Sequence, residues 1–329
     1  MRSGILCSGN WVVDLIKIID RWPQEGMLAN ILSETMNGGG GPHNVLVNLA
    51  KMDPDLPLFA SGLVSNDKFG KFLELELDKF GINRSYLFKT SEESTSFTDV
   101  MTNKSNGNRT FFHKRGTNAL LNLEYFNEVD CNAKIFYLGY PMLLDSLDSN
   151  DSQYGTKAAR LLSSMRMKGL INAVDLVSIE NENYKEIIQP ILRFTDYLII
   201  NEIEAEKCSG IPTRGDGKLL KQNLSKASNA LLNSGVNKMV AIHAPEGGFA
   251  ESIEGEKLFV NSKNILDDEI KGSVGAGDAF CAGMLYGLHQ EFDLKKCLEI
   301  ANTNAWFNLQ NETSTGGAVS ANKIFEKIK

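Results

Sequence analysis

Buried strand-like segments alternate with amphipathic helix-like segments along most of this chain, and this alternation restricts the fold more than any single motif does. The strand-like segments are short and apolar: 4–9, 58–64, 134–140, 170–175, 196–201 and 238–244. The helix-like segments have apolar residues at helical spacing: 43–52, 66–81, 154–169, 202–210 and 218–235. Strands that alternate with helices predict a mainly parallel sheet with helices on both faces, an α/β fold.

Two stretches, at about residues 11–36 and 94–114, depart from this alternation. Each contains extended segments around a turn signal, "PQEG" in the first and "NGN" in the second, which is typical of antiparallel hairpins. We expect them to form a small β-sheet lid over a binding site. The alternative is that they are edge strands of the main sheet. No repeat or long linker interrupts the chain, so residues 1–329 are expected to form a single domain.

The composition is that of a globular protein, with 42% apolar and 23% charged residues. The net charge of -7 argues against a nucleic-acid partner, which needs a basic face, but backbone amides can still bind small anions. The five cysteines share no C-x-x-C spacing and read as reduced. No apolar run approaches the roughly 18 residues that cross a bilayer, and no signal sequence is evident. We therefore expect no membrane contact and a cytoplasmic location.

The segment "GSVGAGDAF", residues 272–280, places three glycines and an aspartate directly before an apolar run with helical spacing. The backbone N–H groups of Gly275, Ala276 and Gly277 can form an anion nest at a helix N-terminus, which suits a phosphate. Asp278 beside them either takes a proton from an alcohol that attacks a phosphoryl group, or caps the helix. The loop matches neither the Walker pattern nor a dinucleotide-binding fingerprint, so a nicotinamide dehydrogenase is a distant alternative.

Several motifs, in a shared order, resemble those of the ribokinase-like (PfkB-type) carbohydrate kinases. The family's late signature DTTGAGDxFxxG is matched by "GSVGAGDAFCAG" (272–283), and its early G-G-x-x-x-N by Gly39, Gly40 and Asn44. Three further segments also match: "GLVSNDKFG" (62–70), "NGNRTFFHKRGTNALL" (106–121) and "NEIEA" (201–205). These landmarks cover nearly the whole chain, so the resemblance rests on their joint order.

The resemblance implies a three-layer α/β/α core with a β-sheet lid, and Mg²⁺- and ATP-dependent phosphorylation of a hydroxymethyl group of a small sugar. Carried over by position, Asp278 becomes the catalytic base and residues 275–277 the anion hole. Asn201 and Glu204 lie where the family organises the phosphates and magnesium, Glu204 on the metal side; two surface polar residues at a helix start is the alternative. Asn302 lies where the family often has an asparagine near adenine, or is a helix-surface amide.

Asp14, in "GNWVVD", stands between apolar residues on a predicted strand, where a carboxylate is costly unless it is hydrogen-bonded. Sugar hydroxyls would satisfy it, and the family has a substrate-binding aspartate about here; a lid-edge aspartate that faces solvent is the alternative. The same resemblance implies further residues in the floor of the substrate pocket: Asn10, Gly39, Gly40 and Asn44. His43, next to them, either touches substrate or packs.

The G-N-x-x-x-D spacing that ends at Asp14 differs from the N-x-D of typical ribokinases and resembles that of nucleoside kinases in the superfamily. A nucleoside kinase is therefore the nearest alternative to a sugar kinase. A catalytically silent member that binds a sugar or nucleotide and regulates a partner is a second alternative, against which the retained Asp278 argues. Exposed lid edges can pair between subunits, so a homodimer through the lid is a further expectation.

The glycine-rich loop departs from the family at a potassium site. Many ribokinase-like enzymes bind potassium with oxygens from the loop that begins with the aspartate of DTTGAGD, and Gly272 stands at that position here. Val274 replaces a threonine, so Ser273 alone keeps a hydroxyl, although an acidic residue of the preceding segment 267–269 could reach in. We expect a kinase that needs ATP and magnesium but depends little on potassium.

Overall fold

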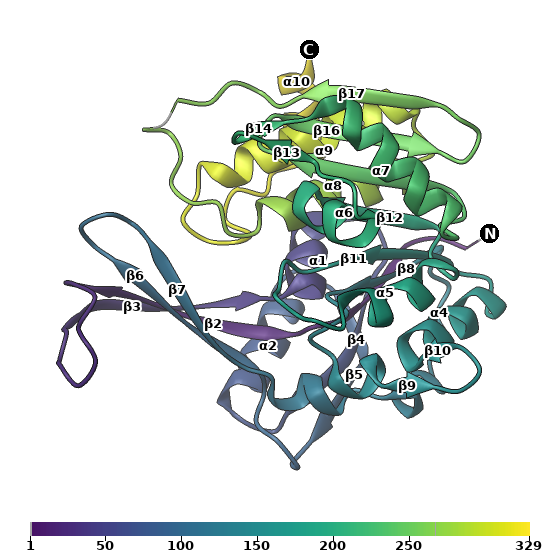
Figure 1. The fold of residues 1–329 in the computed structure, drawn as a ribbon. Helices are drawn as coiled ribbons and strands as arrows, with labels where there is room; N and C mark the ends of the chain where they lie inside the picture. The colour runs from purple at the N-terminus through teal and green to yellow at the C-terminus, as the bar shows by residue number, and fades with distance from the viewer. Residues whose placement is uncertain (1, 267) are drawn as a thin grey trace.

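The computed structural model describes residues 2–266 and 268–329. Its centre is a nine-stranded sheet of order β17-β16-β15-β12-β11-β8-β1-β4-β5 (Figure 1). Neighbouring strands run parallel from β15 to β5, and β16 and β17 are added antiparallel at one edge. The strands are β1 Ile5–Gly9, β4 Leu58–Ser65, β5 Asn83–Thr90, β8 Ile135–Gly139, β11 Ile171–Asp175, β12 Tyr197–Asn201, β15 Met239–Ala244, β16 Gly247–Ser252 and β17 Lys257–Asn261.

The central strands are buried on both faces, which explains their continuous apolar sequences. In β1, Ile5 and Cys7 point into one hydrophobic core and Leu6 points into a second, and all three are fully buried. Because successive side chains of a strand point to opposite faces, a strand between two cores needs apolar residues at every position. The two cores lie on the two faces of the sheet, so the predicted three-layer α/β/α architecture is confirmed.

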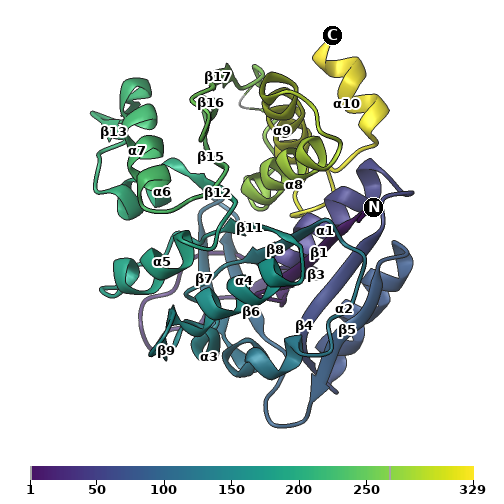
Figure 2. The same cartoon turned by 90° about the vertical axis from the view of Figure 1, so that its right-hand side faces the viewer.

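Helices form the outer layers, and Figure 2 shows α6 and α7 on one side of the strands and α8 and α9 on the other. One face carries α1 Gly41–Met52, α2 Lys68–Lys79, α8 Ala276–His289, α9 Leu294–Leu309 and α10 Ala321–Ile328. The other face carries α4 Lys157–Met167, α5 Tyr184–Leu192, α6 Glu202–Ser209 and α7 Lys221–Asn233. The remaining elements are short: the helix α3 Asp145–Asp148, the 3₁₀ turns Gly116–Leu120 and Leu123–Phe126, and the strands β9 Asn150–Asp151, β10 Gly155–Thr156, β13 Arg214–Gly215 and β14 Lys218–Leu219.

A separate four-stranded sheet of order β3-β2-β6-β7 projects from this core (Figure 1). Its strands are β2 Val12–Ile19, β3 Ile31–Gly39, β6 Phe97–Asn103 and β7 Arg109–Lys114. The pairs β2–β3 and β6–β7 are antiparallel hairpins, and β2 joins β6 in parallel. The two stretches that depart from the alternation therefore build one small sheet, as predicted, and the alternative that they are edge strands of the main sheet is wrong.

The β16–β17 hairpin is one of the elements that the sequence patterns do not predict, along with β5, α5 and α10. Its first strand opens with Gly247 and Gly248, which read as a turn. In the structure a Cβ atom at Gly248 would lie 2.7 Å from the Phe280 ring, so the glycine lets α8 pack directly on the strand.

Within the described ranges, no helix is both long and apolar enough to cross a membrane.

The packing of α8 on α9 depends on a glycine. A Cβ atom at Gly283 in α8 would lie 2.6 Å from the Cα atom of Ala301 in α9. Gly283→Ala therefore forces the helices apart, and the overpacking penalty of about 1–3 kcal/mol exceeds the roughly 1 kcal/mol that alanine gains in helix propensity. We expect a lower free energy of unfolding in urea denaturation.

The matched control is Gly215→Ala, because a Cβ atom there meets only the Leu220 side chain, at 3.5 Å. Equal or greater stability of Gly283→Ala relative to this control would contradict the packing account.

Candidate active site

The helix α8 begins beside the carboxyl ends of β12 and β15, and Gly275 makes that start possible. Gly275 is the N-cap with a φ of 77°, and a Cβ atom there would lie 2.4 Å from the Ser314 carbonyl oxygen. Among the described residues the N–H groups of Gly275 and Gly277 have no acceptor, whereas the Ala276 N–H donates to the Ser273 carbonyl at 3.3 Å. The first turn therefore presents backbone donors where an anion hole was predicted.

Asp278 lies in the same turn but does not cap the helix, which has no side-chain cap. Its side chain is buried, with 4% exposed. The Tyr140 hydroxyl donates to Oδ1 at 2.6 Å, and the Asn44 amide donates to Oδ2 at 2.8 Å. Burial raises the pKa of Asp278, and these two hydrogen bonds oppose that rise because they stabilise the charged form. Asp278 is thus a buried, oriented carboxylate beside the backbone donors at the start of α8.

A cavity of about 250 Å³ opens beside Asp278 and Gly277. Asp175, the last residue of β11, and Glu204 of α6 line it with Asn201 and Tyr140. Burial, followed by the charges of Glu204 and Asp278, raises the pKa of Asp175 well above its usual range. Carboxylates from two neighbouring strand ends and α8 therefore gather at the edge of the sheet where ligands of α/β proteins bind.

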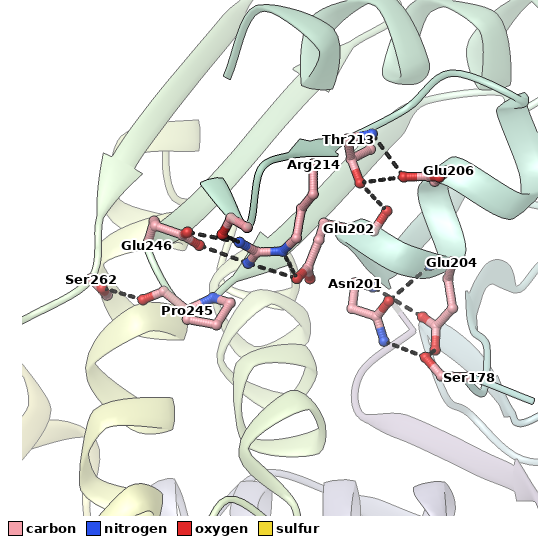
Figure 3. Close-up of polar contacts among 11 residues, drawn as sticks. Ser178, Asn201, Glu202, Glu204, Glu206, Thr213, Arg214, Pro245, Glu246 and Ser262 are labelled. Atoms are coloured by element: carbon pink, nitrogen blue, oxygen red, sulfur yellow. Dashed lines mark hydrogen bonds and ion pairs between the residues drawn. The ribbon is translucent and has the colours of Figure 1, made fainter. Parts of the chain in front are cut away.

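Asn201 and Glu204 form a reciprocal cap at the start of α6 (Figure 3). The Asn201 side chain accepts the Glu204 N–H at 2.8 Å, and Glu204 accepts the Asn201 N–H at 3.0 Å. Ser178 adds a hydrogen bond to the second carboxylate oxygen of Glu204 at 2.9 Å. Glu204 is buried, with 3% exposed, and burial raises its pKa. The alternative of two surface polar residues is therefore wrong for Glu204.

A second, larger cavity of about 660 Å³ adjoins the first and shares Asn201, His243 and Gly277 with it. Asn302 lines this cavity from α9, but it is buried and its amide donates to the Val260 carbonyl at 2.9 Å. It is therefore not a helix-surface amide.

An ion-pair cluster holds two walls of the larger cavity together (Figure 3). Arg214 donates to Glu202 at 2.8 Å, and it binds Glu246 in a bidentate pair with both distances 2.9 Å. The Arg214 guanidinium also holds the pKa of Glu246 below its usual value. Glu202 begins α6, and Glu246 follows the cavity residue Pro245 in the β15–β16 turn, so the cluster fixes two strand ends relative to each other.

Asp14 lies on β2, near enough to Asp278 for the two charges to interact, and lines neither cavity. Burial and the nearby charge of Asp278 raise the pKa of Asp14 to about 7, and a hydrogen bond with Thr98 opposes that rise. A Cβ atom at Gly39 would lie 2.3 Å from Asp14 Oδ2, and one at Gly40 would lie 1.9 Å from the Asn10 carbonyl oxygen. The glycines therefore allow the backbone to approach Asp14 and Asn10, and the predicted floor residues come together around Asp14.

Three side chains near Asp14 have a buried polar atom with no hydrogen-bond partner in the described part of the chain: Asn10 Nδ2, Asn37 Nδ2 and His43 Nε2. Asn37 pairs with Asp14 across β2 and β3, and the His43 ring lies against Gly38. Buried polar groups are normally satisfied, so this group of three atoms suits a ligand rich in hydroxyls. Asn44 differs from them, because both ends of its amide are engaged, one by Asp278 and one by the Ser314 hydroxyl.

Several oxygens of the loop that precedes α8 already accept hydrogen bonds. The Ser273 carbonyl accepts the Ala276 N–H, and the Val274 carbonyl accepts the Asn308 amide at 2.9 Å. Of the acidic segment 267–269, Glu269 accepts the Leu266 N–H at 3.0 Å, and residue 267 lies outside the described residues. Arg109 of the small sheet lies against the same loop, with Nη2 3.2 Å from the position of a Cβ atom at Gly272.

The sequence model of the pfkB family carbohydrate kinases matches residues 3–320, which is nearly the whole chain. The chain belongs to this family. The expected family and fold are thereby confirmed, and so is the class of phosphotransferase.

The relatives of this chain are named after different substrates. A nucleoside kinase of Methanocaldococcus jannaschii is 22% identical over 99% of this chain and 96% of its own length. A fructokinase of Vibrio alginolyticus is 23% identical over 82% of each chain. The solved structure of Arabidopsis thaliana ribokinase complexed with ribose and ATP covers 100% of this chain and 99% of its own, with a TM-score of 0.79 at 20% identity, and shows the shared fold.

Four residues of the site were not identified from the sequence. Asp175 ends an apolar strand, a position that could have singled it out because ligands collect at strand ends in α/β folds. Tyr140 likewise ends the predicted strand 134–140, and Arg109 lies in the matched segment 106–121, whereas Asn37 carries no such local signal. Their positions depend on strand order and on the register of the small sheet.

Proposed function

We propose that this protein transfers the γ-phosphoryl group of ATP to a hydroxymethyl group of a small sugar. The observation that carries the proposal is the place of Asp278. Its buried carboxylate lies in the first turn of α8, where it lines the smaller cavity at the strand ends and is near enough to Asp14 for the two charges to interact. A base at that point can reach a substrate hydroxyl on one side and a phosphoryl group on the other.

In the proposed reaction the substrate hydroxyl oxygen attacks the γ-phosphorus and its proton passes to Asp278. The bond between the γ-phosphorus and the bridging oxygen breaks, and its electron pair leaves with ADP. The N–H groups of Gly275 and Gly277 would stabilise the charge on the phosphoryl oxygens, since they have no acceptor among the described residues. The larger cavity would take the nucleotide, with Asn302 toward the adenine.

Magnesium would neutralise the charge of the phosphates when it is bound. Mg²⁺ sites of this kind use one or two carboxylates together with phosphates and water. Glu204 fits that role beside the smaller cavity, with Asn201 fixing its orientation. In the described part of the chain no group of three or more His, Cys, Asp or Glu residues could hold a metal by itself, which suits a metal that arrives with the nucleotide.

The small sheet would act as the lid. It carries Asp14 to the site and reaches the glycine-rich loop through Arg109, so its closure would bind substrate and exclude water at the same time.

The outer strands of the small sheet, β3 and β7, are edges that expose large apolar side chains, among them Ile31, Leu32 and Phe112. These edges support the proposed homodimer through the lid. The cytoplasmic location stays a prediction.

A nucleoside is the second candidate substrate. The spacing around Asp14 and the similarity to the nucleoside kinase of M. jannaschii favour it. Measuring substrate-dependent ADP release over a panel of sugars and nucleosides separates the two. Absence of ADP release with every member of the panel would favour the catalytically silent regulator instead.

Asp278→Asn removes the proposed base and keeps the size and planar shape of the side chain. We expect kcat to fall by roughly 10²–10⁴-fold. ATP affinity should change little, because Asp278 faces Asn44 and Tyr140 and does not line the larger cavity. Steady-state kinetics and calorimetric titration with ATP measure the two quantities.

Asp293→Asn is the control, since Asp293 caps α9 through the Lys296 N–H at 2.8 Å. It should keep full activity. An Asp278→Asn enzyme that retains more than a tenth of the activity would remove Asp278 from the mechanism.

Sugar binding is expected to depend on pH through Asp14. The pKa of Asp14 is raised to about 7 in the free protein, and sugar hydroxyls donate to its ionised form. Binding therefore favours the carboxylate, so affinity is full above pH 7 and weakens as the pH falls below it, by up to about tenfold per pH unit. Calorimetry between pH 5.5 and 8.5 measures this.

Asp14→Asn should bind sugar more weakly and should lose the pH dependence, because an amide does not titrate in this range. An unchanged sugar affinity in this variant would assign Asp14 to the lid surface.

The enzyme is expected to need magnesium but to depend little on potassium. Gly272 supplies no carboxylate and Val274 no hydroxyl, and the carbonyls of Ser273 and Val274 each already accept one hydrogen bond. Initial rates are measured against potassium at fixed magnesium and ionic strength, with tetramethylammonium as the replacement cation. A saturable activation of about tenfold or more would show that a cation site persists without the aspartate.

A further inference from the structure

The segment that follows β8 is held in an unusual backbone conformation beside Asp278. Tyr140 has a φ of 63° and Met142 a φ of 83°, a region that residues other than glycine seldom occupy. The Tyr140 N–H donates to the carbonyl of Asp175 at 3.0 Å, which anchors the segment to β11. Such conformations cost free energy and are concentrated at functional sites. Here the conformation aims a phenol at the proposed base.

We propose that Tyr140 is a positioning residue for the base Asp278, an inference that rests on the proposed function. Its hydroxyl donates to Oδ1 at 2.6 Å, and Asn44 donates to Oδ2 at 2.8 Å. Two donors from different elements fix the plane of the carboxylate. Each carboxylate oxygen has two lone-pair sites, so one site on each oxygen stays available to accept the substrate proton.

Tyr140 acts as a donor and not as a second base. Burial, followed by the charge of Asp278, raises the pKa of the Tyr140 phenol well above its usual range, so the phenol keeps its proton wherever the enzyme works. A phenol that always donates favours the ionised form of Asp278, which is the form that can accept a proton.

Other ionisable groups also face Asp278, from five elements of the fold. They are Asp14 on β2, Asp175 at the end of β11, Tyr137 on β8, Cys281 on α8 and His243 at the end of β15, with Glu204 of α6 acting on Tyr140 and Asp175. The charge of Asp278 raises the pKa of Asp14 and Asp175, burial raises the pKa of Asp278 itself, and burial keeps His243 uncharged, so it supplies no positive charge. The hydrogen bonds from Tyr140 and Asn44 are what counters this environment.

Tyr140→Phe tests the proposal, because it removes the hydroxyl and keeps the ring. The acid limb of the kcat–pH profile, measured at saturating sugar so that the titration of Asp14 in the free protein does not enter, should move to higher pH, so the fold loss of activity should be greater at acid pH than at pH 8.5. The KM for ATP should not change. Replacing Tyr140 by a 3-fluorotyrosine, whose phenol is a stronger donor, should move the acid limb the opposite way.

Tyr86→Phe is the matched control, since its hydroxyl makes an equally short bond of 2.6 Å, to the Asp130 carbonyl, at an exposed position. It should leave the pH profile unchanged. A Tyr140→Phe enzyme whose activity falls equally at all pH values, or not at all, would overturn the positioning role.

A second readout does not depend on activity. With ¹³C-labelled aspartate carboxyls, the Asp278 signal, assigned from the Asp278→Asn variant, should titrate at higher pH in Tyr140→Phe than in the unmodified protein. Identical titrations would overturn the proposal about Tyr140. If the titration moves but neither enzyme phosphorylates any sugar or nucleoside, the proposed function fails and the positioning contact stands.

Discussion

The hydrogen bond between Asn44 and Asp278 joins residues 234 positions apart and sets the geometry on which the rest of the site depends. A carboxylate buried in an apolar core is costly unless its oxygens are hydrogen-bonded. The bond therefore requires the first turns of α1 and α8 to meet, and the Ser314 hydroxyl secures the other end of the Asn44 amide at 3.0 Å. The glycines at 40 and 275 follow from the same requirement, because a side chain at either would collide with neighbouring backbone.

The same site concentrates buried carboxylates, and the parallel sheet is what brings them together. Asp175 ends β11, Glu204 follows β12, and Asp14 comes from the small sheet, each with its pKa raised mainly by burial. Like charges in a dry site oppose folding, so such clusters are characteristic of sites where function sets the requirement. In the proposed reaction the magnesium ion, rather than the anionic nucleotide, would supply positive charge beside these carboxylates.

Local sequence patterns are enough to predict much of this structure. The alternation predicts the layered fold, and the loop 272–280 predicts both a helix N-terminus and a carboxylate beside it, since each depends on a few consecutive residues. The contact between Tyr140 and Asp278 could not be predicted in this way, because it depends on β8 lying next to β11, and strand order is not encoded in a local sequence. Asn37 escapes it because a shift of one residue in the β2–β3 register would turn its side chain to the opposite face.

The register of the small sheet also determines which side chains each of the two candidate substrates would contact. Asn37, Asp14, Thr98 and His113 are paired across the small sheet, so they lie in one row on one face, and the Thr98 hydroxyl and His113 Nδ1 are 3.0 Å apart.

The next row on the same face is different in character. It consists of Thr35, Ile16, Val100 and Phe111, and the Phe111 ring is largely exposed. A small sugar has hydroxyls for the first row and nothing for the second. A nucleoside has hydroxyls on its ribose and a flat, weakly polar base, so it would use both rows, with the base against apolar and aromatic side chains. Under the proposed function, the choice between the two substrate classes would therefore lie in the row beyond Asp14, and the proposed chemistry at Asp278 would be the same for both.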